Sequence, residues 1–185
     1  LVNAGNINCR KKTLHPDKMV ATFLMGTKDF YEWVNENPMV EMYPEEYVND
    51  PQVIAKNDKM ISINSALQVD VLGQVAADTL GPLQFSGVGG QVDFIRGALG
   101  SKGGKSIIAF PSTAARGKIS RIVPMLDTGA CVTTTRNDVQ YIVTEYGIAE
   151  LHGKTVRERM QALIDIAHPD FRDEIKEKAM SIYFK

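Results

Sequence analysis

Strand-like and helix-like apolar patterns alternate along this chain, and the alternation constrains the fold more than any other feature of the sequence. Runs rich in β-branched residues predict strands, and apolar residues three and four apart predict the helices between them. Such alternation is typical of an α/β sandwich with a mixed, largely parallel sheet flanked by helices. The predicted strands lie in 18–26 (buried), 60–78 (broken near Gly73), 105–112, 118–126 and 138–151 (ended by Gly147). The predicted helices lie in 27–38, after Gly90, in 156–167 and in 168–183.

Local signals support several of these boundaries. Thr27 and Thr155 are suited to helix N-caps, Pro38 to a stop, and Pro169 to a first helical turn. The segment 47–58 is predicted to be rich in turns, because Asn and Asp precede a proline there.

Composition limits the classes of function. With 21 Lys and Arg against 22 Asp and Glu, the chain lacks the basic excess that binding to nucleic acid or anionic membranes requires. The two cysteines have no metal-ligand spacing, so we expect no metal, and a reducing cytoplasm is the default location. No apolar run approaches the roughly 20 residues of a membrane span. A length of 185 residues suits one domain, and the missing initial Met suggests a piece of a longer protein.

Two glycine-rich turns could bind phosphate. In the first, "GVGGQV" (87–92), Val92 occupies the position where the dinucleotide fingerprint needs Gly or Ala. In the second, "GSKGGKS" (100–106), three residues separate Gly100 from Gly104 where a P-loop has four, and the turn leads from helix to strand. The second is therefore predicted to be a simple turn. The first could direct backbone N–H groups at a phosphate or an oxyanion, or bind nothing, and the sequence leaves these alternatives open.

Six segments occur in an order that resembles a known family. They are "SINSALQVDVLGQV", "SGVGGQVDFIRGA", "SKGGKSIIAFPSTA", "GKISRIVP", "VTTTRNDVQYIVTEYGIAELHGKTVRER" and "IAHPDFRDE". Together they resemble the C-terminal domain of the acetyl-CoA hydrolase/transferase family, most closely its 4-hydroxybutyrate (butyrate/acetate) CoA-transferases. The resemblance implies a NagB/CoA-transferase-like fold for residues 1–185 and homo-oligomerisation. It also implies class I chemistry, in which coenzyme A passes between an acyl-CoA and a short carboxylic acid through a glutamyl-CoA thioester.

The resemblance also assigns catalytic residues. The family's nucleophilic glutamate would lie just before Leu1, so this chain alone is expected to be inactive without its own N-terminal domain. Asn49 in "VNDP" would donate to an acyl oxygen, although Asn before Asp-Pro also simply forms turns. Glu145 in "TEYG" would be a hydrogen-bonding or charge partner in the site. A simpler alternative is a carboxylate at a strand end that pairs with Arg or Lys. A third alternative, which we favour less, is that Glu145 is itself the nucleophile, because Glu-x-Gly also surrounds the nucleophile of other class I CoA-transferases.

Coenzyme A contacts follow from the same resemblance. Gly90, with Gly89 beside it, would supply oxyanion and CoA-contacting amides, and Leu67 would line the CoA channel. Arg116 and Lys118 would meet CoA phosphates. Each assignment has a simpler alternative. The glycines could form a turn that binds nothing, Leu67 could be an ordinary core residue, and Arg116 and Lys118 could belong to a solvated loop.

Two other functions remain open on the sequence. An acyl-CoA hydrolase would use the same intermediate with water as acceptor. A non-catalytic CoA-binding domain would carry no glutamate upstream.

Overall fold

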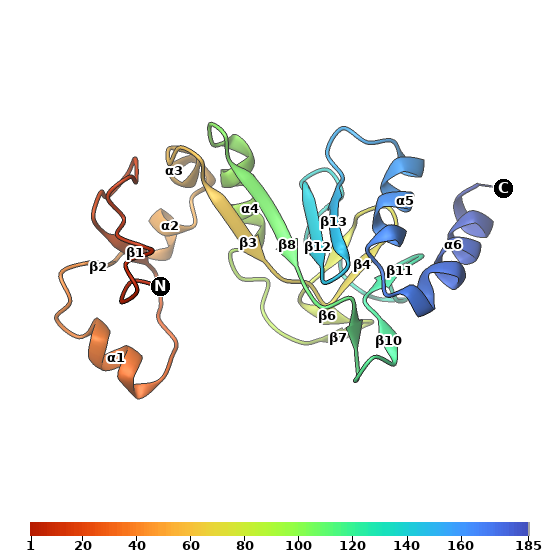
Figure 1. Cartoon of the computed structure of the whole chain (residues 1–185), viewed down its shortest axis with the longest axis horizontal. Helices are drawn as coiled ribbons and strands as arrows, with labels where there is room; N and C mark the ends of the chain where they lie inside the picture. The colour runs from red at the N-terminus through yellow and green to blue at the C-terminus, as the bar shows by residue number, and fades with distance from the viewer. Residues whose placement is uncertain (185) are drawn as a thin grey trace.

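A computed structural model describes residues 1–184, and its largest sheet has four strands. In the order β13-β12-β8-β3, strands β3, β8 and β12 run parallel, and β13 returns antiparallel beside β12 (Figure 1). Their bounds are β3 Ile61–Asn64, β8 Lys105–Ala109, β12 Tyr141–Thr144 and β13 Gly147–Glu150. The predicted α/β class with a mixed sheet is confirmed.

The principal helices are α4 (Gln91–Gly100), α5 (Val156–Asp165) and α6 (Pro169–Tyr183). Helix α4 packs on β3 and β8, and α5 packs on β13 and α6. Their apolar stripes meet the buried side chains of one sheet face, so that face forms the core. The largest fully buried apolar side chains are Ile95, Ile108, Ile122, Ile142, Leu151 and Leu163.

Smaller sheets extend this core. A three-stranded sheet has the order β11-β4-β5, and two antiparallel hairpins pair β6 with β7 and β9 with β10. The bounds are β4 Gln68–Asp70, β5 Val75–Ala76, β6 Thr79–Leu80, β7 Leu83–Gln84, β9 Thr113–Ala114, β10 Ile119–Ser120 and β11 Ile122–Val123. The strands predicted in 60–78 therefore do break around Gly73, whose φ is +88°.

The N-terminal elements lie to one side of the sheet (Figure 1, red to orange). They are β1 Met19–Ala21, α1 Lys28–Val34, β2 Val40–Met42, α2 Glu45–Val48 and α3 Pro51–Ala55. Backbone–side-chain bonds join this part to the rest: the Leu14 amide donates to Asn57 Oδ1 at 3.2 Å, and the Asp58 amide donates to Thr13 Oγ1 at 3.0 Å. Among residues 1–184, no helix is both long and apolar enough to cross a membrane.

Capping predictions are confirmed. Thr27 accepts from the Phe30 amide, and Thr155 forms a capping box with Glu158. Pro169 lies in the first turn of α6, whose N-cap is His168. The segment 100–106 is a helix-to-strand turn with Gly103 at φ +72°.

Three local predictions are wrong. The strand expected over 18–26 covers only Met19–Ala21, and Phe23 and Met25 are exposed, because its two-stranded sheet has no second layer to bury them. The segment 47–58 holds helix α3 rather than only turns, because Asp50 caps the Gln52 amide and Pro51 fits the first turn. The strand expected over 138–151 is a hairpin that turns at Glu145 and Tyr146.

The contact between α3 and α4 yields a stability prediction. A Cβ at Gly97 would lie 2.4 Å from Ile54 Cγ2 and 2.5 Å from Ile54 Cβ, which is anchored to the α3 backbone. Gly97→Ala is therefore expected to lower the free energy of unfolding by about 1–3 kcal/mol, despite alanine's better helix propensity. Urea unfolding measures the change. Gly100→Ala in the same helix is the control, because its Cβ would lie 3.3 Å from Ala55 Cβ. Equal stabilities for the two variants would contradict the prediction.

Candidate active site

Three parallel strands end at one edge of the main sheet. Ser65 follows β3, Ser112 lies beyond β8, and Glu145 follows β12 directly. Helix α4 begins at this same edge, because it runs back along the sheet before β8 (Figure 1). In α/β sheets, ligands bind outside the carboxyl ends of the strands. This edge is therefore the candidate active site.

Asn49 and Gly90 meet at this edge although they lie 41 residues apart. Asn49 is the C-cap of α2, and Gly90 is the N-cap of α4. A Cβ at Gly90 would lie only 2.6 Å from Asn49 Nδ2, so this close approach requires a glycine. The φ of Gly90, −87°, is open to any residue. Gly89 has φ +60°, a left-handed conformation that favours glycine.

The start of α4 is rich in hydrogen-bond donors. No side chain caps Gly90, so the first amides of this ten-residue helix point out of the helix without an intrahelical acceptor. The helix dipole adds partial positive charge there. Gln91, which is buried, fixes this end in place. Its Nε2 donates to the Ser65 carbonyl at 2.7 Å, and its Oε1 accepts from Thr134 Oγ1 at 2.9 Å.

A cleft of about 370 Å³ opens beside this helix end. Leu67 and Gly90, both predicted to contact CoA, line it together with Gly87 and Val88. The cleft also contains a residue that the sequence reasoning missed, Arg121.

Arg121 is a partly buried cation. Its Nη1 donates to the Ala66 carbonyl at 3.3 Å, and its buried Nε has no hydrogen-bond partner among residues 1–184. Nor does any carboxylate in that range form an ion pair with it. The signal was an arginine inside the apolar run "KISRIVP", since arginine is seldom buried without a partner.

Glu145 is held by one serine. Its Oε2 accepts from the Ser112 amide at 2.8 Å, and its Oε1 accepts from Ser112 Oγ at 2.7 Å. Desolvation alone would raise the pKa of the Glu145 carboxyl, but the two Ser112 bonds, the Glu145 backbone amide and the nearby His168 together hold the pKa below its usual value. The carboxylate is thus ionised at neutral pH. The partner is Ser112, not the Arg or Lys that the simpler reading of the sequence expected.

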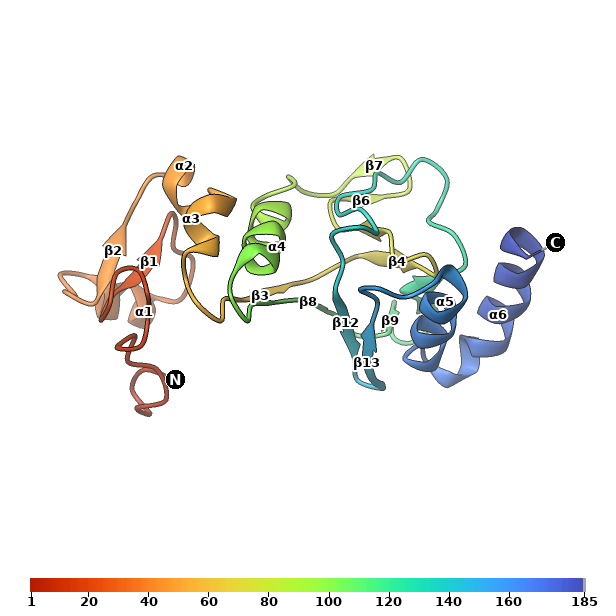
Figure 2. The same ribbon diagram turned by 90° about the horizontal axis from the view of Figure 1, so that it is seen from above.

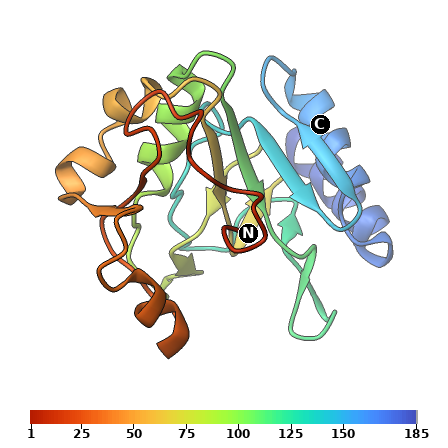
Figure 3. The ribbon, with the colours of Figure 1, turned by 60° about the vertical axis from the view of Figure 1, so that its left-hand side comes forward.

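Arg116 and Lys118 lie elsewhere. Arg116, at φ +58°, is in the turn of the β9–β10 hairpin, which projects from the domain in Figure 3. Lys118 lines a separate groove of about 610 Å³ between this hairpin and α6. Neither residue lines the Gly90 cleft. Within the described part of the chain, no cluster of three His, Cys, Asp or Glu residues could hold a metal ion.

Comparison with known proteins gives a consistent result. Residues 26–179 match the model of the acetyl-CoA hydrolase/transferase C-terminal domain. The chain is 66% identical to 4-hydroxybutyrate coenzyme A transferase of Clostridium kluyveri, over 95% of this chain and 41% of the relative. RipA of Yersinia pestis superposes with a TM-score of 0.93 at 46% identity, over 99% of this chain and 41% of that one. A 4-hydroxybutyrate CoA-transferase of Porphyromonas gingivalis superposes with a TM-score of 0.83 at 50% identity, over 98% and 42%. The chain thus spans about two-fifths of the length of these relatives.

Proposed function

Because the chain belongs to the acetyl-CoA hydrolase/transferase family through its C-terminal domain, we propose that the full-length protein transfers coenzyme A between an acyl-CoA and a short-chain carboxylic acid. The acids would be of the 4-hydroxybutyrate, butyrate or acetate type, in keeping with the names of its relatives. The observation that carries the proposal is the meeting of the Asn49 amide with the uncapped start of α4 at Gly90.

The proposed reaction proceeds through a covalent intermediate on a glutamate outside this chain. The glutamate carboxylate attacks the thioester carbon, and the C–S bond breaks to release CoA thiolate and leave a mixed anhydride. The thiolate then attacks the glutamyl carbonyl of the anhydride. This forms the glutamyl-CoA thioester and releases the first carboxylate. An acceptor carboxylate reverses these steps and leaves as its CoA thioester.

Each step passes through a tetrahedral oxyanion, and this chain would supply donors to it. Asn49 Nδ2, which donates to Glu45 Oε1 at 3.4 Å in this structure, lies beside Gly90, and it would join the amides at the start of α4 in stabilising the developing negative charge. Leu67 would pack against the pantetheine part of CoA in the cleft. Glu145 would hold its ionised carboxylate at the neighbouring strand end through Ser112. Without the upstream glutamate, this chain would be inactive.

Kinetics of the full-length protein test the proposal. We expect continued turnover of an acyl-CoA only when a carboxylate such as acetate is present, with ping-pong kinetics. Mass spectrometry of protein incubated with acyl-CoA alone should find a CoA adduct on a glutamate upstream of this chain. Rapid thioester loss without an acceptor would establish a hydrolase instead. Tight CoA binding without any turnover would indicate a non-catalytic domain.

Glu145→Gln separates a supporting role from that of the nucleophile. Glutamine has one acceptor oxygen where the carboxylate accepts two bonds from Ser112, so one donor loses its acceptor. We expect adduct formation to slow by roughly 10-fold without being abolished. Ser112→Ala is the matched control, because it removes the Oγ bond and keeps the carboxylate. Complete loss of the adduct in Glu145→Gln, with the adduct retained in Ser112→Ala, would make Glu145 the nucleophile.

A further inference from the structure

One face of the four-stranded sheet has no helix packed on it among residues 1–184, and only the N-terminal segment lies beside it. In β3, Ser62 is buried against the core, whereas Ile61 and Ile63 point the other way and are 44% and 70% exposed. Ile148 of β13 is 69% exposed on the same face. Figure 2 shows α4 on one side of β3 and β8, with no helix of residues 1–184 directly on the other side. The apolar alternation in β3 thus points away from the core of this chain.

The strand register joins these side chains into one surface, which we call the open sheet face. Ile63 lies beside Ile107, and Ala109 lies beside Val143, which pairs with Ile148. Polar groups lie at two of its borders. Lys105 Nζ lies 6.0 Å from the centre of the Tyr141 ring, and Tyr141 Oη donates to Glu150 Oε1 at 3.2 Å. An apolar centre with polar borders is typical of a surface that another element covers.

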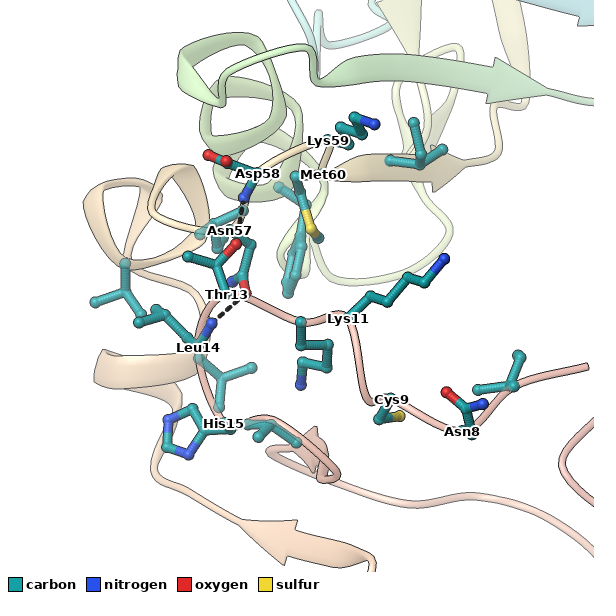
Figure 4. A pocket seen from close by; sticks show the side chains of 18 of the residues that line it. Asn8, Cys9, Lys11, Thr13, Leu14, His15, Asn57, Asp58, Lys59 and Met60 are labelled. Atoms are coloured by element: carbon teal, nitrogen blue, oxygen red, sulfur yellow. Dashed lines mark hydrogen bonds between the residues drawn. The ribbon is translucent and has the colours of Figure 1, made fainter.

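Two features extend the open sheet face at β3. Strand β3 is the last strand in the sheet order, so its outer edge has no strand partner among the described residues. Next to it lies a cavity of about 530 Å³ between β3, α3 and the N-terminal segment (Figure 4). Met60 and Ile61 line this cavity, and Ile61 also belongs to the open sheet face. The cavity therefore adjoins the open sheet face at Ile61.

We propose that the part of the full-length protein that precedes this chain covers the open sheet face. The relatives are more than twice as long as this chain, and the matching family model is that of a C-terminal domain, so the family carries further chain upstream. Leu1 lies on the side of β3 and β8 that faces away from α4 (Figures 2 and 3). The N-terminus of the described chain is thus on the same side of the sheet as the open sheet face. This inference does not depend on the proposed reaction.

The chemistry of the face specifies what would cover it. Parallel sheets are normally covered on both faces, and an amphipathic helix with an apolar stripe is the usual cover. The stripe would carry Leu, Ile or Val against Ile63, Ile107 and Val143. An acidic side chain of the cover would suit the Lys105 border, and a basic one would suit Glu150.

Cysteine labelling of the full-length protein tests the proposal. In a background with Cys9 and Cys131 changed to serine, single variants Ile63→Cys and Ile148→Cys report on the face. Lys28→Cys is the reference, because the Lys28 side chain is 87% exposed on α1. The rate of maleimide labelling in buffer is compared with the rate in denaturant. We expect the two reporters to be slowed at least 100-fold and the reference less than 10-fold.

Three outcomes decide between the possible covers. Protection that persists when the protein is diluted to a monomer supports a cover from the same chain. Protection that disappears on dilution assigns the face to a second copy and overturns the proposal. If both reporters are labelled at the reference rate, the open sheet face is exposed to solvent in the full-length protein, and the proposal is overturned. Should Ile63→Cys fail to fold, as judged by circular dichroism, Ile148→Cys on the antiparallel strand carries the test. The labelling rates do not depend on catalytic turnover. Failure of this proposal is therefore distinguishable from failure of the proposed function.

Discussion

Gly90→Ala is expected to lower the turnover of the full-length protein by roughly 10²-fold while changing its stability little. The new Cβ would lie 2.6 Å from Asn49 Nδ2 and 3.3 Å from Phe94 Cδ2. The nearest atom is the end of a flexible side chain, so the fold relieves the clash by moving the Asn49 amide. That movement displaces the donor proposed to meet the oxyanion. Steady-state kinetics and urea unfolding measure the two effects, and Gly90→Val should lose at least as much turnover.

Gly87→Ala is the matched control for this prediction. It lies in the same loop and lines the same cleft, but a Cβ there meets no atom within 4 Å. We expect turnover within about twofold of wild type, because no donor has to move. A double variant adds a second test. If Gly90→Ala acts by moving Asn49, it should cost little further turnover in an Asn49→Ala background. Wild-type turnover in Gly90→Ala would remove the oxyanion role from this loop.

Local features of the fold could be predicted from the sequence. The caps at Thr27 and Thr155 and the start of α4 after Gly90 depend on residues within one helical turn. The hairpin at Glu145 was missed, because a β-branched run reads the same whether it continues straight or turns back. The sequence also did not indicate which side of β3 packs against the core. The alternation places Ile61 and Ile63 on the same side of the strand, which would normally be the buried side. In the structure these two residues are exposed, and the buried side carries Ser62.

Contacts distant in sequence limited the prediction of the site. Glu145 pairs with Ser112, 33 residues away, and nothing local to either residue indicates this. The resemblance named Asn49 and Gly90 separately, but the packing of α3 on α4 brings them together. Arg116 and Lys118 illustrate the opposite case. Both basic residues lie between Ser112 and Arg121 in the sequence. Their hairpin nevertheless places them outside the cleft at Gly90. Contact of Arg116 and Lys118 with CoA phosphates stays a prediction.

The charge in the cleft is Arg121, and its removal is the second large effect that we expect. Arg121→Met keeps much of the side-chain volume but loses the guanidinium, whose buried Nε has no protein partner among residues 1–184. A hydrogen bond to a charged group contributes about 1.5–3 kcal/mol, and 1.4 kcal/mol corresponds to tenfold. We therefore expect kcat/KM of the full-length protein to fall by roughly 10²-fold. Arg121→Lys should recover part of the loss, because it restores the charge without the planar fork.

The pattern of KM values identifies what Arg121 binds. Arg121 lines the same cleft as Leu67 and Gly90, where the reacting acyl group would lie, so we expect it to bind the carboxylate of the exchanged acid. The KM for the acid should then rise far more than the KM for acyl-CoA, whose thioester carries no such charge. A larger rise in the KM for acyl-CoA would point to a CoA phosphate instead. Arg96→Met is the control, because Arg96 is an exposed arginine on α4 paired with Asp138 at 3.1 Å. If Arg121→Met and Arg96→Met have equal kcat/KM, the cleft does not use its cation.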